Sequence, residues 1–291
     1  MLNMLSKQRA RGQKAAGGKK RSSRLLTIVL LLCLAAGVCL LVYPTFSDYW
    51  NSLHQSRAIA SYQEAVGDLD AQRYDELLAQ AQVYNAALPH DDGRFRPSAD
   101  EQAAYNAALD VSGTGIMGYI EIPKINVSLP IYHGTDAAVL QVAIGHIEGS
   151  SLPVGGAGTH CVLSGHRGLP SAKLFTDLDQ LVEGDTFALH VLNETLTYEV
   201  DQILVVEPAD VSALAIEEGK DYCTLVTCTP YGVNSHRLLV RGHRIENTDV
   251  LSVASDADWL APLWIAPFVA IPVLLVVLLV EWIRMRRNRE R

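Results

Sequence analysis

The sequence predicts a mainly β domain, built as a closed or nearly closed barrel, with a helical segment before it and a transmembrane helix at each end. Three observations lead to this prediction: two uncharged apolar runs near the chain ends, basic residues gathered outside these runs, and many short β-like runs separated by turns. The chain has 291 residues and 49% hydrophobic content, enough to build a core, which excludes disorder for most of its length.

The first apolar run covers residues 25–43. It has no charged side chain and is long enough for a helix to cross a hydrocarbon layer of about 30 Å. A cleaved signal peptide is the alternative. Its apolar region is normally shorter, and the small-residue match at Ala35-Ala36-Gly37 lies inside the run. We therefore expect a retained membrane anchor.

The second apolar run covers residues 260–280 and also carries no charge. Its three prolines should bend a helix without preventing it from spanning. A buried core helix is the alternative, but the arginine cluster in residues 281–291 argues against it. We expect a second transmembrane helix.

The charges are sorted by region. Residues 1–24 form a tail with eight Lys/Arg and no acid, and residues 281–291 form a tail with five Arg and two Glu. The section between residues 25 and 280 holds 11 basic and 30 acidic residues. Positive flanks stay inside, so the prediction is a two-span protein of the cell membrane, with both termini cytoplasmic and residues 44–259 outside. An acidic folded section does not fit a nucleic-acid binder.

Residues 44–113 are predicted to be a helical extension. Apolar residues recur mostly every three or four positions along one stripe, with polar residues opposite, and Gly67-Asp68 interrupts the pattern. Residues 90–97 form a polar loop containing Gly and Pro, and a short helix then resumes over Ala99–Leu109.

Residues 114–246 are predicted to form the β-barrel. The sequence alternates around Pro123, and turns with Gly, Pro, Asn or Asp separate the further runs. These β-like runs are His160–Leu163, Thr186–Leu192, Thr195–Val206, Thr224–Thr227 and Arg237–Val240. Residues 247–259 are a polar linker to the second span.

Three cysteines lie in the outer section, so at least one thiol there is unpaired. Cys228 ends a β-branched run just before Thr-Pro, which places it at the open end of a strand, a position that suits a nucleophile. Cys161 and Cys223 begin apolar runs and fit buried small hydrophobes better.

A nucleophilic thiol needs a partner to take its proton. His166 follows a short apolar run and precedes a loop, the same kind of strand-end position as Cys228. The rivals on local pattern are His133, His146, His160 and His236.

Acyl transfer also needs donors for the oxyanion that develops on the carbonyl oxygen. Arg237 begins the strand that follows Cys228, and Arg241 shares its face but lies further away. A solvated face or an ion pair is the alternative for each arginine. The residues alone leave these assignments open. The histidines lack metal-ligand spacing and no Cys pair has C-x-x-C spacing, so we expect no metal and no cofactor.

Three stretches carry a family resemblance: GIMGYIEIPKINVSLPIYHGT (115–135), GHIEGSSLPVGGAGTHCVLSGHRGLPSAKLFTDLDQL (145–181) and TLVTCTPYGVNSHRLLVRGHR (224–244). Over about residues 60–246 the chain resembles the sortases, and among them the pilus-assembling class C enzymes of Gram-positive bacteria. Spans at both ends also resemble class C.

The resemblance implies an eight-stranded sortase-type barrel in which Cys228 is the nucleophile, His166 its partner and Arg237 the catalytic arginine. It implies surface or pilin proteins as partners, each with a sorting signal like Leu-Pro-x-Thr-Gly. Cys228 would attack the Thr carbonyl, and a Lys amine of a pilin subunit would resolve the acyl-enzyme.

The chain departs from class C at the lid, which usually carries an Asp-Pro-aromatic motif. The corresponding stretch here runs from Asp91 to Phe95 without the Pro. The resemblance implies that Asp92 pairs with Arg237 and that Phe95 covers Cys228. An ordinary polar loop is the alternative.

The predicted activity is thus a membrane-anchored cysteine transpeptidase. The alternatives are a thiol hydrolase or protease that resolves the acyl-enzyme with water, housekeeping-type anchoring of surface proteins to the cell wall, and a non-catalytic membrane scaffold. Loss of the Cys, His or Arg would indicate the scaffold, and all three are present.

Overall fold

The computed structural model describes residues 2–247, 274, 277–278, 280–282 and 284. The chain divides into two compact units, Met1–Phe46 with Ser255–Arg291, and Ser47–Ala254. Of the predicted second span, only residues 274, 277, 278 and 280 lie among the described residues, and these are helical. The rest of that span and residues 248–259 of the predicted linker lie outside them.

The first long helix, α1 (Leu2–Gly67), contains the predicted anchor. From Ile28 onward it is long and apolar enough to cross a membrane, and none of its apolar stretch is buried. Within the described residues it is the one helix that meets these criteria.

The helical extension has the breaks that the sequence predicts. Helix α1 ends at Gly67, and the Asp70 carboxylate caps α2 (Ala71–Ala87) by accepting from the Arg73 backbone N–H at 2.7 Å. A short 3₁₀ turn, η1 (Asp92–Phe95), follows. Ser98 then begins α3 (Ala99–Ala107) with a full capping box.

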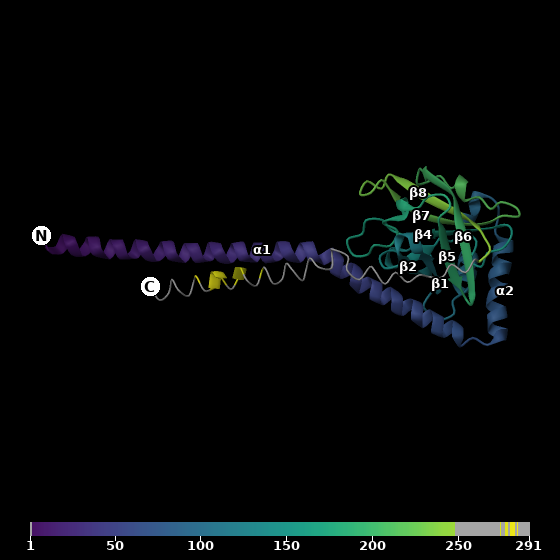
Figure 1. Ribbon diagram of the computed structural model, residues 1–291, viewed down its shortest axis with the longest axis horizontal. Helices are drawn as coiled ribbons and strands as arrows, with labels where there is room; N and C mark the ends of the chain where they lie inside the picture. Colours follow the sequence, from purple (N-terminus) through teal and green to yellow (C-terminus); the bar gives the residue numbers. More distant parts are fainter. Residues whose placement is uncertain (1, 248–273, 275–276, 279, 283, 285–291) are drawn as a thin grey trace. The chain divides into compact units, whose positions relative to one another are not determined.

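Eight strands close into a barrel in the order β1-β2-β3-β4-β7-β8-β6-β5. Figure 1 draws this barrel with α2 beside it. The pairs β2–β3 and β4–β7 are parallel and the others are antiparallel. The strands are β1 (Ile116–Ile122), β2 (Val127–His133), β3 (Ile144–His146), β4 (Thr159–Ser164), β5 (Thr186–Val191), β6 (Glu194–Val206), β7 (Asp221–Thr229) and β8 (His236–Arg244). The eight-stranded barrel with a helical extension is therefore confirmed.

Short elements fill the connections: η2 (Pro123–Ile125), α4 (Ala137–Leu140), η3 (Leu178–Gln180) and η4 (Ser212–Leu214). Strand β3 was not predicted, because three residues are too few to show alternation. Its place comes from pairing with β2 and β4.

One hydrophobic core fills the barrel and extends to the helices that pack against it. Leu163, Leu225 and Val240 point inward from β4, β7 and β8, and each is at most 1% exposed. Leu77 of α2 and Tyr105 of α3 belong to the same cluster. The helical extension is thus part of the folded domain, and its loop 90–97 is held against the barrel.

Candidate active site

Strands β7 and β8 place Cys228 directly opposite Arg237. The strands are antiparallel, with these two residues as Cα partners. Side chains of such a pair leave the sheet on one face, with Cβ atoms about 4.5–5.5 Å apart. Both are partly exposed, whereas their neighbours Thr227 and Leu238 are buried. The thiol and the guanidinium therefore share the outer face of the barrel wall.

His166 lies beside Cys228 because the chain after β4 continues alongside β7. The last registered pair of this parallel ladder is Ser164 with Val226. The Gly165 backbone N–H then donates to the Val226 carbonyl at 3.0 Å, which carries the pairing past the strand end. Two residues beyond Ser164 and Val226 stand His166 and Cys228. The imidazole and the thiol thus come from adjacent segments, and the structure brings the three predicted residues together.

Gly165 is required by the close approach of a buried ring. A Cβ at this position would stand 2.7 Å from the Phe175 ring. The Gly165 carbonyl accepts from the Thr227 hydroxyl at 2.8 Å, and the His166 carbonyl accepts from the Phe175 N–H at 3.2 Å. These bonds turn the chain after β4 and fix the backbone that carries the imidazole.

The two arginines of β8 have different surroundings. The Arg241 guanidinium donates to both oxygens of Asp201, at 2.9 and 3.0 Å, and lies over the Tyr222 ring at 4.2 Å. Arg237 donates only to the Asn234 and His236 carbonyls, at 3.4 and 3.2 Å, and has no carboxylate partner in the described part of the chain. Its remaining donors are available to a carbonyl oxygen that bears developing charge.

The two other outer cysteines have the buried positions expected of small hydrophobes. Cys161 and Cys223 are Cα partners on β4 and β7, exposed by 3% and 0%, and both are free thiols. Burial raises the pKa of Cys223 well above its ordinary value. Among the outer cysteines, Cys228 is the partly exposed one.

The rival histidines have structural partners. His146 and His160 are buried, and each makes hydrogen bonds inside the domain. The ring nitrogens of His133 face the Gly115 and Ala108 carbonyls, at 3.0 and 2.7 Å. His236 pairs with Thr229, and these two residues are the strand neighbours of Arg237 and Cys228. Because side chains alternate along a strand, the His236 side chain leaves the face of the sheet opposite to the Cys228 thiol.

The segment 90–97, here called the lid segment, rests on the same outer face as the three residues. Phe95 packs on a cluster that contains Val226 and Leu239, which are themselves cross-strand partners. Each lies two residues from Cys228 or Arg237 along its strand. Phe95 therefore packs on the same hydrophobic cluster as the strand residues that neighbour the thiol and the guanidinium.

The lid segment is fastened by a residue that the sequence did not single out. Arg94 is 5% exposed, donates to the Leu214 carbonyl at 2.6 Å, and lies over the Phe95 ring at 4.6 Å. The expected pair of Asp92 with Arg237 is wrong for this structure: no ion pair joins them within the described residues. Nothing in the local sequence distinguishes a buried arginine in a polar loop, because its acceptor lies 120 residues away.

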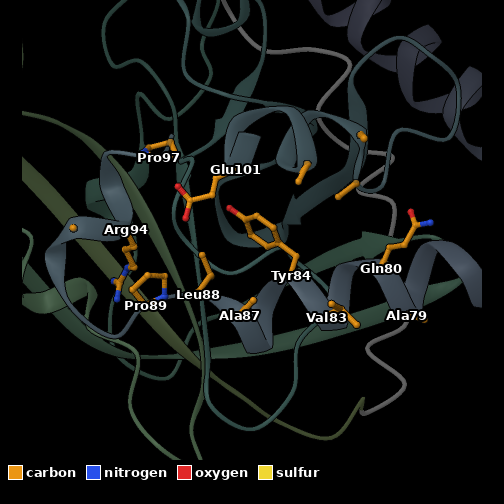
Figure 2. A pocket seen from close by; sticks show the side chains of 14 residues that line it. Ala79, Gln80, Val83, Tyr84, Ala87, Leu88, Pro89, Arg94, Pro97 and Glu101 are labelled. Atoms are coloured by element: carbon orange, nitrogen blue, oxygen red, sulfur yellow. The ribbon is translucent and has the colours of Figure 1, made fainter. Parts of the chain in front are cut away.

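A groove of about 730 Å³ lies between α2, α3 and the lid segment. Figure 2 shows Val83 and Tyr84 of α2 and Leu88, the residue that follows α2, along it, with Glu101 of α3 across from them and Arg94 toward one end. None of the three predicted catalytic residues lines it. The groove is a feature of the extension, separate from the site on β7 and β8.

No cluster of three or more His, Cys, Asp or Glu suited to hold a metal occurs among the residues that the structure describes. A partly exposed thiol, an imidazole beside it and a guanidinium opposite it are instead the groups that acyl transfer through a cysteine requires.

Comparison with known proteins also indicates an enzyme that transfers acyl groups through a cysteine. The model of the sortase domain matches residues 120–245. Sortase D of Bacillus subtilis is 32% identical over 174 residues, which is 59% of this chain and 84% of the relative.

Solved structures give the closer likeness. Sortase C1 of Streptococcus agalactiae has 53% identity and a TM-score of 0.62, covering 66% of this chain and all of that one. Sortase C of Streptococcus pneumoniae, a structure described as giving insights into pilin substrate specificity, has 44% identity and a TM-score of 0.59, over 66% and 98%.

The fold and the site define a cysteine acyltransferase on a β-barrel. The chain belongs to the sortase family, and its similarity to class C sortases makes it a cysteine transpeptidase. Sortases are membrane-associated, which agrees with the one apolar helix described near the N-terminus.

Proposed function

We propose that this chain is a pilus-assembling class C transpeptidase. It cleaves a sorting signal like Leu-Pro-x-Thr-Gly in a pilin or other surface protein. It then joins the Thr carbonyl to a Lys amine of a pilin subunit. The identities of 53% and 44% with sortases C support class C over housekeeping anchoring of surface proteins.

The placement of Cys228 opposite Arg237, with His166 beside it, is the observation that carries this proposal. The Cys228 sulfur bonds to the Thr carbonyl carbon as its proton passes to His166. Arg237 donates to the oxyanion. The Thr–Gly bond breaks, and the Gly amine leaves with the proton from His166. The Lys amine then attacks the thioester, and the thiol is regenerated as the isopeptide bond forms.

The lid segment keeps the resting site covered in this proposal. Phe95 packs on the cluster that contains Val226, two residues before Cys228, and Arg94 ties the segment to η4, the short turn between β6 and β7. A peptide that approaches along the outer face of β4, β7 and β8 displaces the Phe95 ring.

The membrane arrangement is also proposed. Residues 25–43 anchor the enzyme and residues 260–280 form the second span. Both basic tails are cytoplasmic, and the catalytic domain faces outward. The enzyme then meets its substrates at the outer membrane surface.

The test is incubation of the full chain in detergent with a Leu-Pro-x-Thr-Gly peptide, alone, with a Lys-bearing pilin peptide, or with a cell-wall amine. Mass spectrometry should find a thioester on Cys228 and then an isopeptide product. Hydrolysed peptide alone would show that water resolves the thioester, as in a thiol hydrolase. A product with a cell-wall amine but none with the pilin peptide would favour housekeeping anchoring. Thioester formation in Cys228→Ala would refute the assignment of the nucleophile.

A further inference from the structure

Arg167, the residue after His166, is the most extensively bonded side chain near the site. Its side chain is 9% exposed. Its Nε donates to the Thr176 carbonyl at 3.1 Å, and one Nη pairs with the Asp179 carboxylate. The other Nη donates to the Thr229 hydroxyl at 3.4 Å. All three edges of one guanidinium are therefore engaged.

These bonds join two segments that carry catalytic groups. Thr176 and Asp179 lie in the loop that returns after His166, whereas Thr229 follows Cys228 directly. The β4–β7 ladder ends with Gly165 and Thr227. Beyond these residues, among those that the structure describes, one hydrogen bond joins the segment after His166 to the segment after Cys228. It is the bond from Arg167 to Thr229.

The Tyr231 ring completes the contact. The Arg167 guanidinium carbon lies 5.8 Å from its centroid. The ring also lies against Gly168, where a Cβ would stand 2.9 Å from it and where φ is +76°. The backbone after His166 is thus packed against the β7–β8 turn by a cation, a ring and a glycine.

Arg167 lies next to the site but on the other side of the sheet. Thr229 follows Cys228 on β7, and successive side chains of a strand alternate, so the Thr229 hydroxyl leaves the face opposite to the Cys228 thiol. The Arg167 guanidinium, which donates to this hydroxyl, therefore lies on that opposite side. Arg167 does not contact the reacting atoms, and any effect on the reaction passes through the backbone of its neighbours.

We propose that Arg167 is a positioning residue that sets the separation of the His166 imidazole from the Cys228 thiol. This inference rests on the proposed roles of those two residues. A displacement of about 1 Å in such a pair costs about 100-fold in rate. Lysine retains the charge for Asp179 but lacks the planar fork that reaches three acceptors at once, so it is a poor substitute.

The experiment uses the full chain in detergent with Arg167→Lys and Arg167→Ala. The matched control is Arg241→Lys, because Arg241 also lies on a carboxylate and over a tyrosine ring, four residues beyond Arg237 on β8. One measurement is the pH profile of Cys228 alkylation by iodoacetamide, which needs no substrate. The other is kcat and KM with the sorting peptide and amine.

We expect Arg167→Lys to lower kcat about 10- to 100-fold, to leave KM within about threefold, and to move the midpoint of the alkylation profile. Arg241→Lys should leave all three at wild-type values. Wild-type kcat and midpoint in both Arg167 variants would overturn the proposal, and so would an equal loss in Arg241→Lys.

Thr229→Val serves if the Arg167 variants do not fold, because it removes only the acceptor beside Cys228. Thr229→Val should lower kcat and move the midpoint of the Cys228 alkylation profile, each to a smaller degree than the Arg167 variants. A wild-type kcat and a wild-type midpoint in Thr229→Val would then overturn the proposal. If the wild-type chain forms no thioester with the peptides, the proposed function fails, whereas the alkylation profiles still decide the role of Arg167.

Discussion

Removing the Arg94 side chain should open the lid segment without unfolding the domain. In the structure this guanidinium lies over the Phe95 ring and donates a hydrogen bond to the Leu214 carbonyl. Arg94→Ala deletes both contacts, while α2 and α3 retain their own caps at Asp70 and Ser98. The change therefore acts on the position of the segment.

The size of the effect follows from the two contacts. A hydrogen bond from a charged donor contributes about 1.5–3 kcal/mol, and a cation over a ring about 0.5–1 kcal/mol. Burial opposes the charged form and lowers the pKa of Arg94, so part of this gain is offset. A net loss of about 1–2 kcal/mol would raise the open population about 5- to 30-fold.

The assay is the rate at which a bulky maleimide labels Cys228 in the full chain. Arg94→Ala and Phe95→Ala should each label about 5- to 30-fold faster than wild type. The melting temperature should fall by only a few degrees, about 2–4 °C for each kcal/mol lost in a domain of this size, so the domain stays folded during the assay. Asp92→Ala is the control and should label at the wild-type rate, since Asp92 does not hold the segment to Arg237.

A perturbation from the barrel side gives an independent check. A Cβ on Gly149 would stand 2.1 Å from the Arg94 carbonyl oxygen, and φ there is +83°. Gly149→Ala should therefore displace the segment and also speed labelling. If Arg94→Ala, Phe95→Ala and Gly149→Ala all label at the wild-type rate, the segment does not cover the nucleophile.

Three further predictions concern the barrel. Arg237→Lys and Arg237→Ala should each lower turnover about 10²- to 10³-fold, whereas Arg241→Ala should be mild, and near-normal turnover in both Arg237 variants would exclude an oxyanion role. In the native chain iodoacetamide should modify Cys228 but not Cys223, and Cys223→Ala should still form the thioester; the masses of tryptic peptides test both points. Burial lowers the pKa of His160 to about 4, so the unfolded chain binds more protons between about pH 6.5 and pH 4, and the free energy of unfolding should fall by about 2–3 kcal/mol as the pH drops through that window. Urea titrations at pH 7.5 and 4.5 measure this loss, which should shrink in His160→Gln.

Local sequence was sufficient for most of the secondary structure. Gly67 and Asp70 end one helix and begin the next, since a glycine and an Asx cap act on their own neighbours. The longer strands alternate clearly enough to be recognised, and the apolar run at residues 25–43 needs only length and absence of charge. Strand β3 was missed because its three residues gain their structure from β2 and β4.

The chemistry of the site was also visible in the sequence, through strand-end positions and the resemblance of three stretches to sortases. Cys228, His166 and Arg237 each stand beside a turn, which local pattern can recognise. Local pattern could not decide which of the two arginines of β8 is paired with a carboxylate and which has donors available to the substrate. Arg237 and Arg241 share one strand face, and only the partner strand β6, which places Asp201 against Arg241, separates their roles.

The lid segment shows most clearly which features follow from local sequence and which depend on the tertiary structure. The sequence by itself determined a polar loop with an acid and an aromatic between two helices, because Gly, Pro and the capping serine specify a break at those positions. Only the tertiary structure decided that Arg94, and not Asp92, fastens it. The Leu214 carbonyl that receives Arg94 lies 120 residues further along the chain, and it arrives there through the closure of the barrel, where packing and register set the contacts.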